Sequence, residues 1–321
     1  MDYTTLGRTG LKVSVAGLGT GGGSRLGTQT GKSAAQSAAL IHAALDHGVN
    51  LIDTGHNYGT EGIVGAALKS VPREQVILCT KYHDVRMGAR ATPQEVVAGL
   101  DESLRALGTD YIDIFYVHSV RPPNYGFTLS STVPALLREK DKGKFRFLGF
   151  TESGPPDPEH EMAARAIIDD AVDVLMVAFS MLQQNARDMV FPGTRAQQIG
   201  VVCMYAVRNI LSFPGRLQSA MKELAAEHKV PQWLADRDQP LDFLVHEAGA
   251  RDVIDAAYRY IRHEPGVDVT LFGTGDMEHL KSNIASLTRP PLPAADRAKL
   301  SELFGHLIGV GMEYGEARGA A

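Results

Sequence analysis

Short apolar runs alternate with amphipathic stretches along most of this 321-residue chain. The apolar runs are rich in Val, Ile, Leu and Phe and too short for helices, which favours β-strands. The amphipathic stretches repeat their apolar positions every three to four residues, as helices packed on one face do. The predicted strands cover residues 16–19, 51–53, 76–81, 111–118, 145–150, 172–178, 201–204 and 267–272. The predicted helices cover residues 34–47, 61–69, 93–107, 131–142, 159–170, 184–198, 251–263 and 277–286.

Residues that begin or end helices support several of these boundaries. Thr92 followed by Pro93 is typical of a helix start, because threonine caps the first turn and proline fits its first position. Gly48 and Gly108 follow predicted helices and are expected to end them, because glycine readily adopts the left-handed conformation there.

The alternation predicts an α/β protein with a parallel sheet, because each pair of strands is joined by a helical crossover. Eight such units favour a closed (β/α)8 TIM barrel over an open, doubly wound sheet. We expect one domain over residues 1–321, with an N-terminal β-hairpin at 3–13 closing the bottom of the barrel. Residues 205–250 form a long insertion after strand seven, and we expect it to carry helix 216–228 and to cover the cofactor cleft. A last helix is predicted at about 294–308.

Composition narrows the possible partners. The formal net charge is -5, which gives no positive field for nucleic acid or an anionic membrane surface. No apolar run reaches 18 residues, so no membrane-spanning helix is predicted. Cys79 and Cys203 both lie inside apolar runs, which makes a disulfide framework improbable and fits a reducing cytoplasm. The N-terminus shows no apolar core of a secretion signal.

Four polar residues stand at or just after the ends of predicted strands: Asp53, Tyr58, Lys81 and His118. In a parallel barrel such ends meet on one face, where catalysis takes place. A lysine beside a tyrosine stabilises the phenolate and lowers the pKa of the phenol, so that it exchanges protons nearer neutral pH. Asp53 would keep Lys81 charged, and His118 would hydrogen-bond a substrate oxygen. The set suits hydride transfer at a carbonyl carbon.

Each of these residues alone has an ordinary structural explanation. An aspartate at a strand end often caps a helix, a lysine there is often solvated, and a single histidine is more often structural than catalytic. Their joint position on strands two, three and four is much harder to explain in that way. The combination therefore carries the functional hypothesis.

Several segments resemble the aldo-keto reductase family. They are residues 6–14, the segment Leu51–Gly59, Thr80-Lys81, Tyr116–His118, residues 143–149 and residues 273–283. The resemblance implies a (β/α)8 barrel, an NADPH or NADP cofactor with NADH not excluded, and a small carbonyl or alcohol as substrate. It also implies that Tyr58 is the general acid and base, that Asp53 and Lys81 tune it, and that His118 orients the substrate.

The same resemblance implies the cofactor contacts. They are Gly19, Thr20, Gly21, Thr151, Glu152, Met176, Met204, Tyr205, Gly273, Thr274, Gly275, His279 and Asn283. Several depart from the family pattern. Thr151 and Glu152 replace a serine and an asparagine that hold the nicotinamide carboxamide, so we expect the Glu152 carboxylate to accept from the carboxamide NH2.

Three further departures affect the same site. Met176 stands where the family has a glutamine, and methionine packs against a ring without donating a hydrogen bond. Either Met204 or Tyr205 replaces the aromatic residue that stacks on nicotinamide. His279 takes the place of a basic residue that is commonly arginine, which gives a 2′-phosphate a weaker partner.

Three other functions fit part of the pattern. The altered carboxamide contacts are also compatible with a cofactor-binding regulatory protein with little turnover. His56, His118 and Asp53 are a second alternative, as ligands of a metal for hydrolysis, but no metal-binding spacing supports it, so no metal site is predicted. Lys81 would serve a Schiff-base lyase if it were unpaired, whereas Asp53 should keep it charged. The sequence assigns neither the substrate nor the oligomeric state.

Overall fold

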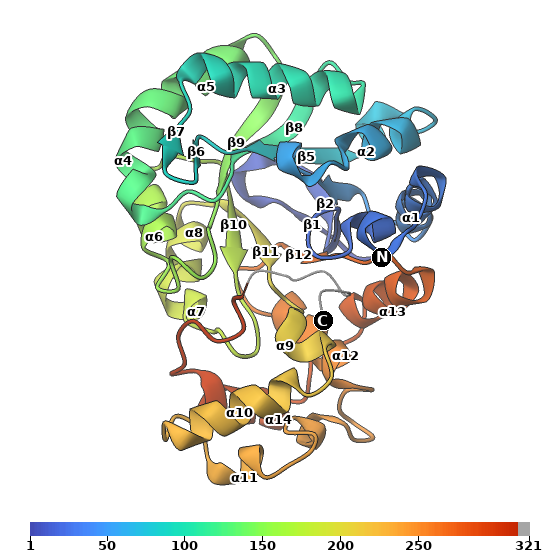
Figure 1. The fold of residues 1–321 in the computed structure, drawn as a ribbon, viewed down its shortest axis with the longest axis vertical. Coiled ribbons are helices and arrows are strands. Elements are labelled where there is room, and N and C mark those ends of the chain that lie inside the picture. Colours follow the sequence, from blue (N-terminus) through green and yellow to red (C-terminus); the bar gives the residue numbers. More distant parts are fainter. Residues whose placement is uncertain (314–321) are drawn as a thin grey trace.

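A computed structural model of the protein describes residues 1–313. Within those residues, eight parallel strands form a closed barrel, as the sequence predicted (Figure 1). Neighbouring strands are joined in sequence order, and the last strand pairs with the first to close the ring. The barrel strands are β3 (Ala16–Gly19), β4 (Leu51–Asp53), β5 (Ile77–Tyr82), β8 (Ile112–Val117), β9 (Phe145–Thr151), β10 (Val174–Ala178), β11 (Gly200–Met204) and β12 (Val269–Phe272).

Helices surround the barrel, and their ends follow the capping residues in the sequence (Figure 1). Thr92 accepts a hydrogen bond from the amide of Glu95, Pro93 lies in the first turn, and Gly108 ends the helix at a φ of 65°. The surrounding helices are α1 (Ala34–Asp46), α2 (Glu61–Leu68), α3 (Pro93–Leu107), α5 (Val133–Asp141), α6 (Glu161–Ile168), α8 (Phe191–Ala196), α12 (Val253–Arg262) and α13 (Met277–Leu287). Of the helices in residues 1–313, none has the length and apolar character that a membrane span requires.

Two predicted helices differ from the structure. The helix expected over 184–198 is divided into α7 (Ala186–Met189) and α8, because Pro192 disfavours helical continuation and the chain at Val190 leaves helical geometry. The helix expected from residue 131 begins earlier, with the short α4 (Tyr125–Phe127) and a π-helical stretch before α5. The hairpin of β6 (Val85–Arg86) and β7 (Ala89–Arg90) was not predicted.

The N-terminal hairpin closes one end of the barrel, as predicted. Strands β1 (Tyr3–Thr5) and β2 (Lys12–Ser14) pair antiparallel. Leu6, Leu11 and Val13 pack into the same buried cluster as side chains from inside the barrel. Leu6 approaches Gly200 at the start of β11 so closely that a Cβ on Gly200 would lie 2.7 Å from the leucine side chain. The hairpin therefore seals the end at which the strands begin.

The insertion after β11 carries the expected helix, α10 (Arg216–Ala226), together with the short helices α9 (Asn209–Ser212) and α11 (Gln232–Ala235). Figure 1 shows α10 and α11 beyond one side of the barrel, with the C-terminal α14 (Ala294–Phe304) next to them. The ammonium of Lys299 in α14 lies 5.1 Å from the ring centroid of Trp233 and 4.2 Å from that of Phe243. The last helix thus packs on the insertion.

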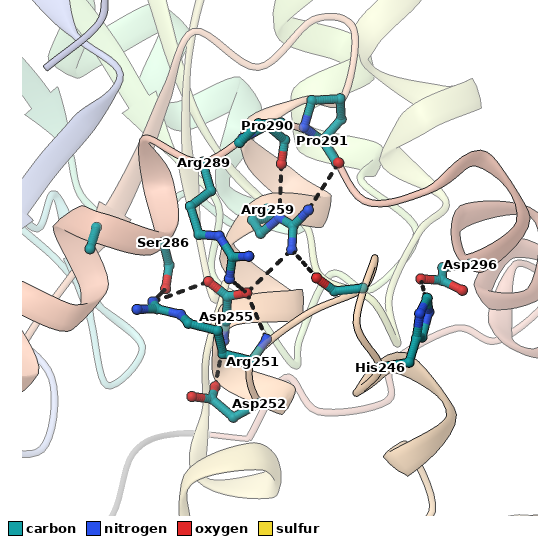
Figure 2. Close-up of polar contacts among 12 residues, drawn as sticks. His246, Arg251, Asp252, Asp255, Arg259, Ser286, Arg289, Pro290, Pro291 and Asp296 are labelled. Atoms are coloured by element: carbon teal, nitrogen blue, oxygen red, sulfur yellow. Dashed lines mark hydrogen bonds and ion pairs between the residues drawn. The ribbon is translucent and has the colours of Figure 1, made fainter.

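A buried carboxylate anchors the end of this insertion (Figure 2). Asp255 in α12 has a fully buried side chain and accepts from Arg289 at 2.6 Å and from Arg251 at 3.2 Å. Arg259, one turn along α12, donates to the carbonyl of Gly249 at 2.7 Å and to the carbonyls of residues 290–291. Hydrogen bonds to the carboxylate outweigh its burial and lower the pKa of Asp255. The network ties the insertion to the segment before α14.

The plug of the barrel gives a test of stability. Leu6→Ala should lower the free energy of unfolding by about 2–5 kcal/mol, because it leaves a cavity in the sealed end. Leu6 is 0% exposed, whereas Leu137 is 43% exposed, so Leu137→Ala is the matched control and should change stability by less than about 0.5 kcal/mol. Denaturant titration of both variants measures the difference. Equal effects would mean that the hairpin does not stabilise the barrel.

Candidate active site

The structure brings the four polar residues together at the ends of adjacent strands. Asp53 is the last residue of β4, and Lys81 lies near the end of β5. His118 directly follows β8, and Tyr58 lies in a 3-10 turn over His56–Tyr58. The strands are parallel and neighbouring, so their carboxyl ends point the same way. The grouping expected from the sequence is therefore present.

Lys81 and Asp53 form a buried ion pair at the base of this group. The Lys81 Nζ donates to Asp53 Oδ1 and to the Thr54 carbonyl, both at 2.6 Å. The two side chains are 1% and 5% exposed. Burial alone would lower the pKa of Lys81, but the facing carboxylate raises it above its ordinary value. The lysine is therefore held as an ammonium ion.

The Tyr58 ring lies over this ammonium. Lys81 Nζ is 5.0 Å from the ring centroid, and a Cβ on Gly21 would lie 2.5 Å from the same ring, so only glycine allows this packing. Burial raises the pKa of the Tyr58 phenol, and the positive charge of Lys81 opposes that rise. The sequence predicted a lowered pKa for this phenol; the structure instead gives a raised one, because burial outweighs the opposing charge of Lys81.

His118 stands edge-on to Tyr58, with ring centroids 5.7 Å apart. Its other face stacks on His83 at 4.0 Å. Burial, with the nearby charge of Lys81, lowers the pKa of His118 well below its ordinary value, and burial lowers that of His83 to about 4. Both rings are therefore neutral near pH 7. The Nδ1 of His118 is buried and has no hydrogen-bond partner among the described residues.

A cleft of about 860 Å³ opens above Tyr58 and Asp53. Most of the predicted cofactor contacts line it: Gly19, Gly21, Met176, Met204, Tyr205, Gly273, Thr274, Gly275, His279 and Asn283. Thr20 and Thr151 do not. Thr20 shares a hydrogen bond with Thr60, and Thr151 accepts one from the amide of Ser119 at 2.7 Å. Backbone segments rich in glycine thus form much of the cleft wall.

Glu152 lies differently from the expectation. Its side chain is 0% exposed and is turned into the protein, not into the cleft. One carboxylate oxygen contacts His160 Nδ1 at 2.7 Å, and the other accepts from the amide of Ala178 at 2.8 Å. The predicted hydrogen bond with a carboxamide is not supported by this orientation, because both oxygens already have protein partners.

The cleft is also lined by residues that the sequence did not single out. Lys32 and Tyr258 line it, and so does Asp252 at the start of α12. No local motif marks them, because they come from separate loops and helices. His279 lies near the start of α13, where the side chain of Asp276 accepts from the amides of Glu278 and His279.

The insertion reaches the cleft over only part of its length. Among the described residues, its first part, 205–213, contributes lining residues, and residues 214–248 contribute none. Arg208 lies over the Tyr205 ring at 4.0 Å and donates to the carbonyl of Glu313 at 3.1 Å. The cover expected over the cleft is therefore restricted to this first part, and its mobility stays a prediction.

The residues considered for a metal do not form a ligand set. His56 pairs with Glu102 at 2.8 Å, and Asp53 is occupied by Lys81. Within residues 1–313, no group of three or more histidine, cysteine or acidic side chains is placed to hold a metal ion.

Similar folds occur among solved structures. The aldo-keto reductase AKR11C1 from Bacillus halodurans, in its holo form, superposes with a TM-score of 0.70 at 20% identity, covering 95% of this chain and 96% of that one. An aldo/keto reductase from Klebsiella pneumoniae, solved in complex with NADP and acetate, gives 0.67 at 21% identity, with the same coverage. At this level of identity the likeness concerns the fold.

Sequence comparison adds the family. The chain is 28% identical to the aldo-keto reductase YhdN of Bacillus subtilis (strain 168), over 98% of this chain and 97% of the relative. It is 27% identical to L-galactose dehydrogenase of Arabidopsis thaliana, over 94% of this chain and 93% of the relative. The model of the aldo/keto reductase family matches residues 17–304, so the chain belongs to this family of NAD(P)-dependent oxidoreductases.

Proposed function

We propose that this protein interconverts a small carbonyl compound, such as an aldehyde, ketone or sugar, and the corresponding alcohol, with NADPH or NADP as cofactor. One observation carries the proposal: the buried Asp53–Lys81 ion pair lies directly under the Tyr58 ring at the base of the cleft. This is an arrangement for moving a proton at a substrate oxygen. The NADP in the Klebsiella pneumoniae relative supports the choice of cofactor.

Each polar residue has one part in the proposed reaction. Tyr58 gives a proton to the carbonyl oxygen during reduction and takes it back during oxidation. Lys81 stabilises the phenolate form by its charge, and Asp53 holds Lys81 in place. Neutral His118 donates a hydrogen bond to the same substrate oxygen, which orients the carbonyl.

The cleft fits a dinucleotide. Gly273 and Gly275 place bare backbone along it, and a Cβ on Gly275 would lie 2.5 Å from Gly27, which leaves room only for glycine. Asn283 is mostly buried at the cleft wall, and Met176 contributes apolar surface near Tyr58. When bound, the nicotinamide supplies or accepts the hydride, and the protein supplies the proton and the orientation.

One alternative has support from a specific observation. Because Glu152 is turned toward His160, the protein lacks one expected contact with the carboxamide, which fits a cofactor-binding regulatory protein with little turnover. Tight binding of NADPH without multiple turnovers on any of a broad panel of aldehydes, ketones and sugars would favour this alternative. Multiple turnovers on one of them would exclude it.

We also propose that residues 1–321 act as one domain, of which residues 314–321 lie outside the described part. Cys79 and Cys203 are both free and buried, which supports a reducing, cytoplasmic location.

Removing the Tyr58 hydroxyl should slow catalysis strongly. Tyr58→Phe should reduce turnover by about 10² to 10⁴-fold while leaving NADPH affinity nearly unchanged, because the ring is kept and only the proton donor is lost. Tyr116→Phe is the matched control. Lys81 Nζ lies 5.8 Å from the centroid of the Tyr116 ring, but Tyr116 is not among the residues that line the cleft. Steady-state turnover rates of the two variants, each compared with the parent enzyme, test the role of the Tyr58 phenol. Turnover of Tyr58→Phe within a few-fold of the parent would refute its role.

Removing the ammonium should change the pH profile. Lys81→Met should move the alkaline rise of the oxidation rate to higher pH, because the pKa of Tyr58 is then raised further and the base form appears later. The double variant Asp53→Asn, Lys81→Met avoids leaving an unpaired buried carboxylate, which would cost about 3–5 kcal/mol of stability. Rates measured across the pH range test both variants. If the Lys81→Met enzyme were slower but its oxidation rate rose at the same pH as in the parent, the charge of Lys81 would not control the pKa of Tyr58.

Cofactor choice can be tested at α13. His279→Ala should weaken NADPH binding by a few-fold and leave NADH binding nearly unchanged, because the exposed end of the cleft is where a 2′-phosphate would meet this ring. Lys281→Ala is the control, since Lys281 is paired with Glu278 at 2.9 Å. Dissociation constants for both cofactors provide the readout. Tighter binding of NADH than of NADPH by the parent protein would overturn the NADP assignment.

A further inference from the structure

Beyond the four catalytic residues, a second buried polar group lies at the end of the neighbouring strands. His160 is 0% exposed and lies between two oxygen atoms: Nδ1 is 2.7 Å from Glu152 Oε1, and Nε2 is 2.9 Å from Asn185 Oδ1. The group links the end of β9, the loop before α6 and the loop before α7.

The partners of Asn185 determine which of its atoms faces the histidine. Its Nδ2 donates to the carbonyl of Pro158 at 2.8 Å, and its Oδ1 also accepts from Gln183 Nε2 at 2.6 Å. Gln183 Oε1 in turn accepts from the amide of Gly309. The atom facing His160 is therefore an acceptor, as is the carboxylate on its other side. Both ring nitrogens must donate, and only the imidazolium form does so.

The backbone at His160 shows that these contacts hold it in place. Its φ of 60° lies in the left-handed region, which costs a residue with a side chain about 1 kcal/mol or more and persists only where the surroundings fix it. The two charge-assisted contacts of the ring supply that constraint.

Glu152 connects this group to the cleft wall. Its amide donates to the carbonyl of Met176 at 3.1 Å, and its carboxylate accepts from the amide of Ala178 at 2.8 Å. Met176 lines the cleft. The carboxylate therefore continues the pairing of β9 with β10 beyond the last residue of β9, next to a residue that would meet the cofactor.

The loop between Glu152 and His160 also supports Tyr205. A Cβ on Gly154 would lie 2.5 Å from the Tyr205 hydroxyl, so the ring rests directly on this loop. Tyr205 itself has a left-handed φ of 72° and lines the cleft beneath Arg208. A shift of the loop would thus move one wall of the cleft.

We propose that His160 is a positioning residue for cofactor binding: its protonated ring, clamped between Glu152 and Asn185, holds segment 152–160 against the cleft wall formed by Met176 and Tyr205. This proposal rests on the cofactor function proposed above. Loss of the ring proton would remove one donor, release the clamp and weaken the binding of NADPH.

The charges around the His160 ring determine whether its contacts are lost at low or at high pH. Burial alone would lower the pKa of His160, but the carboxylates of Glu152 and Asp157 raise it above the ordinary value. On β11, the Cys203 thiol is neutral because burial raises its pKa, and Asn185 and Gln183 carry no charge. The clamp is therefore complete at low pH and is lost as pH rises through the raised pKa of His160.

The test compares the pH dependence of NADPH binding in three proteins, measured by cofactor fluorescence between pH 6.5 and 9. The dissociation constant of the parent should rise by about three- to tenfold over this range, since one pKa unit corresponds to a tenfold change. His160→Gln should bind more weakly at pH 6.5 and show a flatter profile. His306→Gln is the matched control, because His306 hydrogen-bonds the Lys229 carbonyl and is not among the described residues that line the cleft, and it should follow the parent.

A measurement on the parent alone keeps the proposal testable if His160→Gln does not fold. Nitrogen NMR of the histidine ring should show both nitrogens of His160 protonated at pH 6.5 and should report the pH at which the proton leaves. That pH should coincide with the rise of the dissociation constant. A neutral ring at pH 6.5, a mismatch of the two pH values, or a His160→Gln profile identical to that of the parent would overturn the proposal. Absence of NADPH binding at every pH would instead refute the cofactor function itself.

Discussion

The buried ion pair between Asp53 and Lys81 is the constraint around which the candidate active site is built. Two opposite charges are removed from water at the carboxyl ends of β4 and β5, which is tolerated only because they face each other at 2.6 Å and the lysine also donates to a carbonyl. A Cβ on Gly55 would lie 3.0 Å from the Lys81 side chain, so the loop beside the pair is tightly packed. The position of Tyr58 over the ammonium follows from this loop.

Much of the site could be predicted because it depends on where strands end. Asp53, Lys81 and His118 each stand at the end of an apolar run, and a parallel barrel brings such ends to one face whatever the intervening helices contain. Helix boundaries such as Thr92 and Gly108 were predictable for a similar reason, since capping depends on neighbouring residues. The break before α8 was not predicted, although Pro192, the local residue that disfavours a continuous helix, is present in the sequence.

Other parts of the site depend on contacts between distant segments, which no local pattern contains. Glu152 was expected to face the cofactor because of its place in a motif, but its orientation is decided by His160 and by the amide of Ala178. His160 in turn requires Asn185 from another loop. The sequence shows that a carboxylate is present, whereas only the folded chain shows which partner it has. The presence of Lys32 and Tyr258 in the cleft wall likewise could not be read from the sequence, because only the folded chain brings them there.

Helix α12 contacts two separate parts of the protein. Asp252, Ile254 and Tyr258 line the cleft, whereas Asp255 and Arg259 hold the end of the insertion and the segment before α14. Residues 214–248 lie between the cleft-lining segment 205–213 and Gly249, whose carbonyl Arg259 holds, and within the described residues they contribute nothing to the cleft wall. A change of length or sequence within residues 214–248 would leave the described cleft wall and the contacts of α12 in place, so we expect this outer surface to tolerate variation that the cleft does not.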